Sequence, residues 1–353
     1  MRATGQAAGA SPNHRNTGGV KMRLFFKLIS LVMLSLASAA GAQQLPTLGA
    51  DPARVSVSGL SSGAFMAVQY SVAWSSEVMG VGVVAGGPYN CAPPNGAGFI
   101  SVCMQGKPPA ERSWKAAQDF ARDGVIDPVA GIAKQRVYLF SGTKDSVVAP
   151  SVMAAVRDFY GKAKVAPAAL VFVGTMPAGH AFLSAEIGDP CSENGGIFVV
   201  KCPLGATLYD QPGAILNHLY GLKFKPAATL SAAPIAFDQG RYGGDSALMA
   251  AKGYAYVPAA CRASGAHCAV HVVFHGCKQS ADAIGGDAIY AKLGYNRWAD
   301  SNGIVVLYPQ VDASATNPMG CWDWWGYSGL NFQLRHGPQI DAVHQMVARL
   351  LAN

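Results

Sequence analysis

The chain has 353 residues, of which 50% are hydrophobic and only 13% carry a charged side chain. Five of its 27 basic residues and none of its 20 acidic residues lie in residues 1–42, which leaves 22 basic against 20 acidic side chains, a net charge of +2. No run of Lys or Arg remains after residue 42 to suggest a partner that is a nucleic acid or an anionic membrane. A weakly charged surface of this kind suits apolar or solid partners.

The N-terminal region has the layout of an export leader. Arg23 and Lys27 lie just before an apolar run over residues 28–37, and the small residues Ala40-Gly41-Ala42 follow this run. A positive segment, a short apolar segment and a small-residue site are typical of a secretory signal peptide. The apolar run is shorter than the roughly 20 residues that a membrane-spanning helix needs. We therefore expect cleavage near Ala42, with Gln43 as the first mature residue.

The organisation of the chain is predicted to be simple. Residues 1–42 are an N-terminal extension and signal peptide, in which residues 1–21 lie upstream of a more natural start at Met22. Residues 43–353 contain no Pro/Ser/Thr-rich linker, internal repeat or low-complexity tract, and α/β folds of this length are commonly one unit. We expect them to form a single, monomeric domain that is exported to the periplasm or the cell exterior.

The first element of the mature chain points to a nucleophile. Residues 55–60 form a short β-branched run, and Gly-x-Ser-x-Gly at 59–63 leads directly into an apolar-periodic stretch. This strand–turn–helix context is that of a nucleophile elbow, in which Ser61 stands at the tip and the Ser62 N–H faces a developing oxyanion. A side chain at either glycine would block the approach of strand and helix. The alternative is a Gly/Ser-rich turn without chemistry.

All eight cysteines follow the leader. An even number of cysteines in an exported chain predicts disulfides. Sequence proximity favours the pairs Cys91–Cys103, Cys191–Cys202 and Cys261–Cys268, which leaves Cys277–Cys321 as the long-range pair. A zinc site is not expected, because no C-x-x-C spacing occurs.

A carboxylate follows a later strand. Residues 136–140 have the apolar, β-branched composition of a strand, and the loop after them carries Asp145. A buried carboxylate at that place would hold the histidine of a Ser-His-Asp triad in the correct tautomer. Asp123 and Asp127 are competitors, but they follow a helix rather than a strand. Asp145 could also be a turn residue that caps the next helix.

A histidine follows the next strand. A helix near 151–160 and a strand over 169–173 lead to a glycine-bearing loop with His180. This histidine can reach the nucleophile as a general base, and it completes the order Ser61, Asp145, His180 expected of an α/β-hydrolase. The weaker rivals are His218 in a helical stretch, His267 in a predicted disulfide loop, and His336 and His344 near the last helix.

A further strand ends in a motif that suggests an oxyanion hole. Residues 268–274 read as a continuous strand that stops at His275-Gly276-Cys277, and residues 303–308 form the next one. The His-Gly ending resembles the oxyanion loop of esterases, where a backbone N–H complements the one after the nucleophile. Here that donor would be the Cys277 amide. An ordinary glycine turn after a strand is the alternative.

The order of these elements predicts a permuted fold. Strands near 81–85 and 136–140 alternate with helical stretches such as 113–122, which favours a mostly parallel sheet with helices on both faces. The oxyanion strand usually precedes the elbow strand, whereas here it follows more than 200 residues later. A circular permutation explains this order without moving any element in space, because domain termini often lie close together. The predicted class is therefore a circularly permuted α/β-hydrolase fold.

Large aromatic residues gather near the C-terminus. Residues 317–327 hold Trp322, Trp324, Trp325 and Tyr327 in a glycine-rich loop. Such side chains suit an apolar binding crevice, because they offer large rigid contact area with a polar group. The alternative is a satellite core cluster under a long loop.

Three stretches together resemble one family. They are Ser-Gly-Leu-Ser-Ser-Gly-Ala-Phe-Met-Ala-Val-Gln at 58–69, His-Gly-Cys at 275–277 and Asn-Pro-Met-Gly-Cys-Trp-Asp-Trp-Trp at 317–325. They resemble the secreted poly(3-hydroxybutyrate) depolymerases, in particular the single-domain, circularly permuted α/β-hydrolase type. The resemblance covers most of residues 51–345.

The resemblance implies a serine ester hydrolase that cleaves a polyester or its oligomers, with no metal and no cofactor. It implies Ser61 as nucleophile, Asp145 as acid, His180 as base, Ser62 and Cys277 as oxyanion donors, and Asn317 and Trp322 as lining of the ester-chain crevice. Multidomain members also carry a linker and a polymer-adsorbing domain, and neither is recognised before Asn353. We therefore expect amorphous polymer or soluble oligomers to be better substrates than crystalline polymer.

Other functions fit part of the pattern. A carbohydrate esterase that removes acetyl or feruloyl groups would use the same scaffold, and a serine peptidase would use the same triad. A non-catalytic polyester- or granule-binding protein with a decayed site is the alternative from a different class. The presence of Ser61, Asp145 and His180 argues against decay.

Overall fold

The computed structural model describes residues 43–92 and 98–353. The predicted signal peptide over 1–42, with its cleavage site, lies outside the described residues. None of the helices in the described part of the chain is long and apolar enough to cross a membrane.

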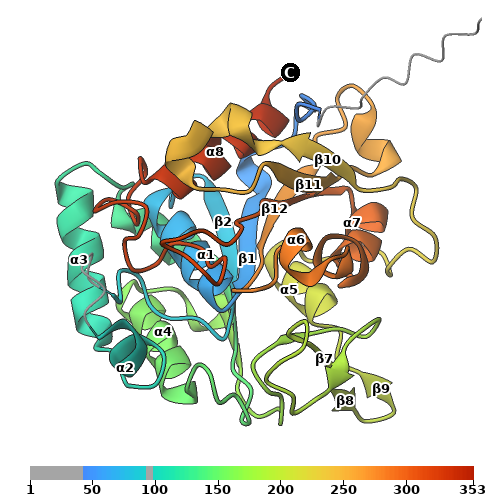
Figure 1. The fold of residues 1–353 in the computed structure, drawn as a ribbon. Coiled ribbons are helices and arrows are strands. Elements are labelled where there is room, and N and C mark those ends of the chain that lie inside the picture. Colours follow the sequence, from blue (N-terminus) through green and yellow to red (C-terminus); the bar gives the residue numbers. More distant parts are fainter. Residues whose placement is uncertain (1–42, 93–97) are drawn as a thin grey trace, which may run out of the picture. The chain divides into compact units, whose positions relative to one another are not determined.

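The centre of the fold is an eight-stranded sheet in the order β10-β11-β13-β12-β1-β2-β3-β4 (Figure 1). Its strands are β1 (Val55–Leu60), β2 (Val78–Val84), β3 (Arg136–Phe140), β4 (Leu170–Val173), β10 (Ile235–Asp238), β11 (Lys252–Tyr256), β12 (Ala269–Phe274) and β13 (Ile304–Tyr308). The six strands from β13 to β4 are parallel, and only the pairings of β10 with β11 and of β11 with β13 are antiparallel. The predicted mostly parallel sheet is confirmed, and each predicted strand lies within three residues of an observed one.

Helices cover both faces of this sheet. They are α1 (Ser62–Ala73), α2 (Phe99–Cys103), α3 (Ala110–Arg122), α4 (Pro150–Lys162), α5 (Gln211–Tyr220), α6 (Ala281–Ile284), α7 (Tyr295–Asn302) and α8 (Pro338–Leu351). Apolar side chains of α1, α3, α4 and α8 share one core cluster with strand residues such as Val57 and Val272. Those of α5 and α7 share a second cluster with strand residues such as Val84 and Val273. Strands buried on both faces often read as near-continuous apolar runs, which explains why strands such as β13 were predictable.

Shorter elements fill the connections. Short strands are β5 (Phe182–Leu183), β6 (Asp189–Pro190), β7 (Val199–Lys201), β8 (Pro203–Leu204) and β9 (Thr207–Leu208). Short 3₁₀-helices are Pro52–Arg54, Val129–Lys134, Pro167–Ala169, Gln239–Tyr242, Gly244–Ala247 and Ala259–Arg262, and a π-helical turn spans Ala288–Lys292. Strands β5 to β7 form a small separate sheet in the segment that follows His180.

The helix α1 is buried along its entire length, and all of its residues are inaccessible to solvent. It packs against β1, β2 and β12 and is also in contact with α8. Its polar Gln69 is satisfied inside the core, where its amide nitrogen donates to the Asp323 carbonyl at 2.9 Å. A helix that is covered on all sides is a rigid support, and Ser61 lies at its N-terminal end.

Segments near the two ends of the described chain are hydrogen bonded to each other. The backbone nitrogens of Gly49 and Ala50 donate to the carbonyls of Ala352 and Leu350, at 2.9 and 3.2 Å. In the sheet, β1 lies between β2 and β12, with Val55 opposite Val270. The elbow strand therefore has its oxyanion strand as a direct neighbour, although the two are more than 200 residues apart in sequence. This arrangement is the circularly permuted α/β-hydrolase fold.

The eight cysteines form four disulfides in the structure. The bonded pairs are Cys91–Cys103, Cys191–Cys202, Cys261–Cys268 and Cys277–Cys321. These are the pairs that sequence proximity predicts. Disulfides of this kind form and persist in oxidising compartments. They therefore indicate a protein that resides outside the cell or in another oxidising compartment.

Candidate active site

The elbow at Ser61 has the strained backbone of a nucleophile turn. Ser61 connects β1 to α1 with φ 57° and ψ −122°, a conformation that costs a non-glycine residue on the order of 1–3 kcal/mol. The predicted reason for the two flanking glycines is confirmed. A Cβ at Gly59 would lie 2.2 Å from the Gly63 carbonyl oxygen, and one at Gly63 would lie 2.3 Å from that of His275. The turn can therefore close only with glycine at both positions.

The predicted acid and base are paired. The Nδ1 atom of His180 lies 2.9 Å from Oδ2 of Asp145, and both side chains are almost completely buried. The other carboxylate oxygen of Asp145 accepts from the backbone nitrogens of Val147 and Val148, each at 2.8 Å. These bonds fix the carboxylate, and the carboxylate in turn leaves the Nε2 side of the imidazole available for proton transfer.

The predicted nucleophile, Ser61, follows the carboxyl end of a strand in the same sheet as this pair. Ser61, Asp145 and His180 follow the carboxyl ends of β1, β3 and β4, which are parallel strands of one sheet. Among the described residues, no hydrogen bond joins Ser61 to His180. Catalytic hydrogen bonds are often long in free enzymes and tighten when substrate binds, so the contact between Ser61 and His180 stays a prediction.

The competing residues have other partners. Asp127 accepts from the Ser76 backbone and lies 3.3 Å from Arg335. His218 bonds the Ala169 carbonyl, and His344 stacks on an indole and lies beside a surface glutamate. These contacts are structural or lie at the surface, whereas Asp145 and His180 are buried and hydrogen bonded to each other, and their roles as acid and base stay a prediction.

Sequence reasoning missed Asn194, which joins the acid loop to the base loop. Its side-chain oxygen accepts from the backbone nitrogens of His180, at 2.8 Å, and of Ser146, at 3.0 Å. Its amide nitrogen donates to the carbonyls of Lys144 and Ser192, at 3.1 and 3.0 Å. Asn194 lies in the loop closed by the disulfide between residues 191 and 202, and no local motif marks it.

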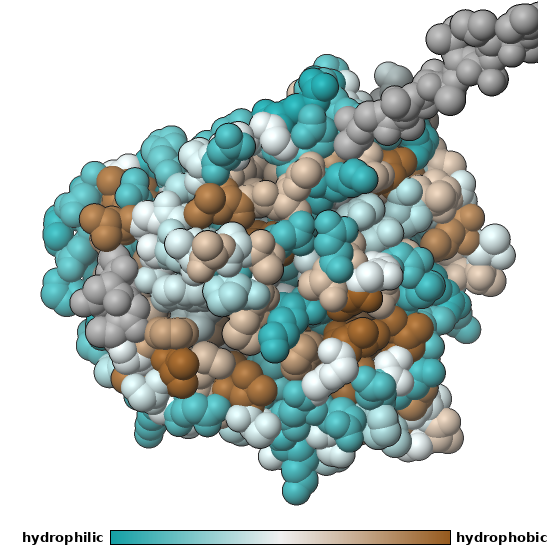
Figure 2. Space-filling view, viewed as in Figure 1, coloured by the Kyte–Doolittle hydropathy of each residue, from teal (hydrophilic) through white to brown (hydrophobic). Residues whose placement is uncertain are grey.

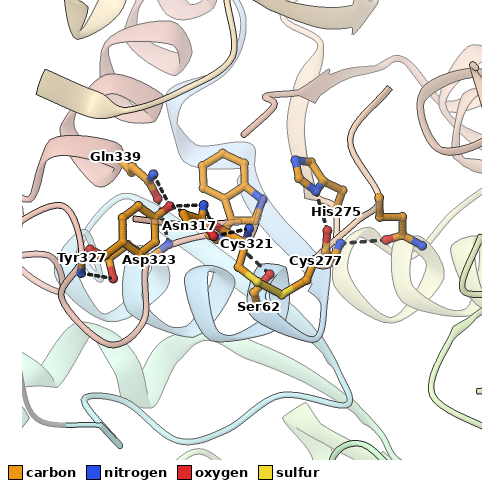
Figure 3. The surroundings of a disulfide bond; sticks show 11 residues. Ser62, His275, Cys277, Asn317, Cys321, Asp323, Tyr327 and Gln339 are labelled. Carbon is orange, nitrogen blue, oxygen red and sulfur yellow. Dashed lines mark hydrogen bonds between the residues drawn. A yellow bond between two sulfur atoms is a disulfide. The ribbon is translucent and has the colours of Figure 1, made fainter. Parts of the chain in front are cut away.

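The two predicted oxyanion donors come from neighbouring elements. Ser62 begins α1, and Cys277 lies just beyond β12, whose last carbonyls contact the start of α1. Within the described ranges, neither backbone amide hydrogen bonds to another protein group. Figure 3 shows the disulfide between Cys277 and Cys321 and, beside it, the hydroxyl of Ser62, which accepts from the Trp322 amide at 3.3 Å. Two unpaired N–H groups beside a nucleophile are the requirement for an oxyanion hole.

Asn317 and Trp322 lie deeper than the sequence suggests. Both are essentially inaccessible to solvent. The Asn317 amide bonds the backbone nitrogen and carbonyl of Cys321 and the Tyr327 hydroxyl (Figure 3). The Trp322 indole packs edge-on against Phe274 and belongs to the main core. In this structure the two side chains support the wall beside Cys277 and do not line an open crevice, so direct contact with a substrate stays a prediction.

The other aromatic residues of this loop form a satellite core. Trp324 stacks on Phe65 of α1 with ring centroids 4.1 Å apart, and Trp325 stacks on Phe99. The loop is organised by Asp323, another residue that sequence reasoning missed. Its buried carboxylate accepts from the backbone nitrogens of residues 325, 326, 327 and 328 and from a serine hydroxyl. For Trp324 the structure therefore supports the alternative interpretation, a satellite core cluster under a long loop.

The surface carries apolar side chains from several segments. Figure 2 shows apolar patches between polar ones on the face that is viewed. Among the described residues, the most exposed large apolar side chains are Ile100, Leu204, Phe224 and Leu330. This pattern agrees with the low fraction of charged residues in the sequence.

Comparisons with known proteins give consistent matches. The chain is 42% identical over 328 residues to a poly(3-hydroxybutyrate) depolymerase of Delftia acidovorans, covering 91% of this chain and 64% of that protein. It is 35% identical over 347 residues to a polyhydroxybutyrate depolymerase of Talaromyces funiculosus, covering 92% and 97%. A solved structure of a PHB depolymerase, a serine-to-alanine variant complexed with R3HB trimer, matches with a TM-score of 0.81 and 33% identity, covering 88% of this chain and 99% of that chain. No family model matches the chain.

Proposed function

The chain belongs to the family of poly(3-hydroxybutyrate) depolymerases, which are carboxylic ester hydrolases, and we propose that it cleaves ester bonds of poly(3-hydroxybutyrate) or its oligomers. The observation that carries this proposal is the buried pair of His180 and Asp145 at the sheet edge where the strained Ser61 turn lies. The family membership and this arrangement point to the same chemistry. The products are 3-hydroxybutyrate monomers and short oligomers.

The proposed reaction follows from the roles of three side chains. His180 takes the proton of Ser61 through Nε2 while Oγ attacks the ester carbonyl, and Asp145 stabilises the imidazolium that forms. The alcohol end of the chain leaves with the proton from His180. Water, activated by the same imidazole, then hydrolyses the acyl-enzyme. The single hydrogen bond from His180 to Asp145 supports this division of roles, because it orients the ring.

The tetrahedral oxyanion is held by the backbone amides of Ser62 and Cys277 in this proposal. Both are free of protein partners in the described part of the chain, and the disulfide between Cys277 and Cys321 limits movement of the second donor. For Asn317 and Trp322 we propose an indirect role. Their contacts hold Cys321 and its loop against the oxyanion side of the site.

We further infer the form in which the protein acts. The four disulfides require an oxidising compartment, which supports export and removal of residues 1–42. The mature form is then residues 43–353, a single domain that acts as a monomer. N-terminal sequencing of the exported protein and its elution volume on gel filtration test these two statements.

The test of the function is release of 3-hydroxybutyrate monomer and dimer from amorphous poly(3-hydroxybutyrate) by the exported, purified protein. Ser61→Ala is measured beside the wild type and is expected to lose at least 10³-fold of the activity, since triad members act as a unit. A variant that retains a tenth of wild-type turnover would exclude Ser61 as nucleophile. If the protein hydrolyses a p-nitrophenyl ester but releases no 3-hydroxybutyrate from the polymer, the proposed triad stands and the proposed substrate is wrong. The substrate would then be another ester, such as an acetylated or feruloylated carbohydrate.

A further inference from the structure

His275 lies directly behind the second proposed oxyanion donor and is fully buried. Its Nε2 atom is 2.9 Å from the backbone nitrogen of Val311. Its Nδ1 atom is 2.7 Å from the carbonyl oxygen of Gly276, the contact that is drawn from the His275 ring in Figure 3. The Val311 N–H can only donate, so Nε2 must be the acceptor. Nδ1 therefore carries the hydrogen and donates it to the Gly276 carbonyl. Both ring nitrogens are used, and the tautomer is determined by the backbone.

The Gly276 carbonyl belongs to the same peptide unit as the Cys277 N–H. A peptide unit is planar and trans, so its C=O and N–H point in opposite directions. A bond that holds the Gly276 oxygen toward the His275 ring therefore holds the Cys277 N–H toward the opposite side. That side is the one on which the described structure offers the amide no protein partner.

The preceding peptide unit is held as well. The Gly276 nitrogen donates to the side-chain oxygen of Gln279 at 2.7 Å, and the Gln279 amide donates in turn to the carbonyls of Ile197 and Phe198. Gly276 is thus clamped on its nitrogen by Gln279 and on its carbonyl by His275. Glycine has the widest choice of backbone conformation, so the direction of the next N–H depends on such external bonds.

The disulfide between Cys277 and Cys321 does not replace this clamp. It restrains the position of the Cys277 side chain, but the peptide plane between Gly276 and Cys277 can still rotate about its flanking single bonds. The loop also joins its neighbour through the Lys278 nitrogen, which donates to the Met319 carbonyl at 2.7 Å. Neither contact involves the Gly276 carbonyl, which has the His275 ring as its hydrogen-bond partner.

We propose that His275 is a positioning residue for the reaction: its Nδ1–H holds the Gly276 carbonyl so that the Cys277 N–H is directed at the tetrahedral oxyanion. This inference rests on the proposed function in taking Cys277 as an oxyanion donor. His275 touches no reacting atom and exchanges no proton with substrate. It acts only through the orientation of one peptide unit.

The tautomer is tested on the unmodified protein. Long-range ¹H–¹⁵N NMR of the imidazoles distinguishes a ring protonated at Nδ1 from one protonated at Nε2, and the spectrum of His275→Gln assigns the His275 signals. The expected result is the Nδ1–H tautomer at pH 7. An Nε2–H tautomer would overturn the proposal, and this measurement requires no catalytic activity.

The positioning role is tested with two variants of similar size. His275→Asn keeps an amide N–H near the Nδ1 position, whereas His275→Gln places its amide near the Nε2 position and cannot donate to the Gly276 carbonyl in the same way. With p-nitrophenyl butyrate, kcat of His275→Gln is expected to fall by about 10- to 100-fold with KM within threefold, since loss of an oxyanion donor costs about 10²–10³ in kcat. His275→Asn is expected to retain kcat within about fivefold. An alkyl boronic acid, whose tetrahedral adduct fills the oxyanion hole, should bind the Gln variant more weakly by the same factor as kcat.

The outcomes separate the proposals. Equal kcat in both variants and in the wild type would overturn the role of His275 and leave the ester hydrolase standing. Equal losses in both variants, with equally lowered thermal midpoints, would also overturn it, because they indicate a packing role only. If the wild type hydrolyses no ester, the proposed function is wrong. The tautomer measurement still tests the hydrogen bonds at His275 in that case.

Discussion

The side-chain oxygen of Asn194 accepts the backbone N–H of His180 at 2.8 Å. Asp145 and His180 come from loops after two different strands, and their mutual position depends on how these loops meet. Asn194 also bonds residues on both sides of Asp145 in the chain. It therefore holds the acid loop and the base loop in one fixed arrangement.

We expect Asn194→Leu to lower kcat for a soluble ester by at least about tenfold while KM changes little, because a small misplacement of the base reduces proton transfer. The measurement is steady-state kinetics together with thermal unfolding. Asn302→Leu is the matched control, since the Asn302 side chain also makes four hydrogen bonds to backbone groups away from the site, three to residues 223 and 224 and one to residue 298 of its own helix. If both variants lose the same stability and the same activity, Asn194 has only a general structural role.

Asn194 also shows where sequence reasoning stops. Ser61 was predictable because the elbow is a local motif in which five consecutive residues determine a turn. The partners of Asn194 lie 2 to 50 residues away and meet only through the path of a disulfide-closed loop. No periodicity or spacing carries that information.

The strands of the sheet were predictable to different extents. Strands β3 and β12 are buried over most or all of their length, and their sequences are largely apolar runs. Strand β1 is also buried but alternates Val with Ser, and it was predicted from the elbow that follows it. Strand β10 at one end of the sheet and its neighbour β11 mix buried, half-buried and exposed residues, and they were not predicted. The burial of Trp322 was equally hidden, because an aromatic residue in a loop suits a core or a binding surface equally well until the loop path is known.

The burial of Trp322 leads to a prediction of its own. Trp322→Ala is expected to destabilise the protein by about 3–5 kcal/mol, the usual cost of a large core truncation, and to reduce cleavage of amorphous polymer and of a short soluble ester by the same factor. Denaturant unfolding and paired activity assays measure the two effects. A loss confined to the polymer would instead assign Trp322 a direct contact with the ester chain.

Asp323 is predicted to determine the shape of the aromatic loop. In Asp323→Asn, one carboxylate oxygen becomes an NH₂ group that faces N–H donors, so we expect a loss of about 1–3 kcal/mol, typical of unsatisfied buried groups. The variant should also show altered near-UV circular dichroism, since Trp324 and Trp325 follow it directly. Asp312→Asn provides a control whose carboxylate has a single serine hydroxyl partner. Unchanged stability and an unchanged spectrum in Asp323→Asn would show that the loop is held by its stacking contacts alone.

Two buried histidines give the protein a predictable loss of stability in mild acid. Burial lowers the pKa of His271 to about 3 and that of His275 to about 4. His271 is held neutral between the hydroxyls of Ser56 and Ser58, at 2.7 and 2.8 Å. In the unfolded chain both rings have an ordinary pKa near 6.5.

The sign of the effect follows from proton binding. Below pH 6.5 the unfolded state binds protons that the folded state excludes. The stabilisation that the two neutral rings contribute is therefore complete above pH 6.5, and the free energy of unfolding decreases as the pH falls toward 4. Between pH 7 and pH 5, where carboxylates change little, each ring is expected to contribute a loss of roughly 2 kcal/mol. Urea unfolding at pH 7, 6 and 5 measures the total. His271→Gln should show about half of the pH-dependent loss, whereas His336→Gln, at an exposed position, should show all of it. A stability that is constant from pH 7 to pH 5 would mean that these buried rings accept protons in the folded protein.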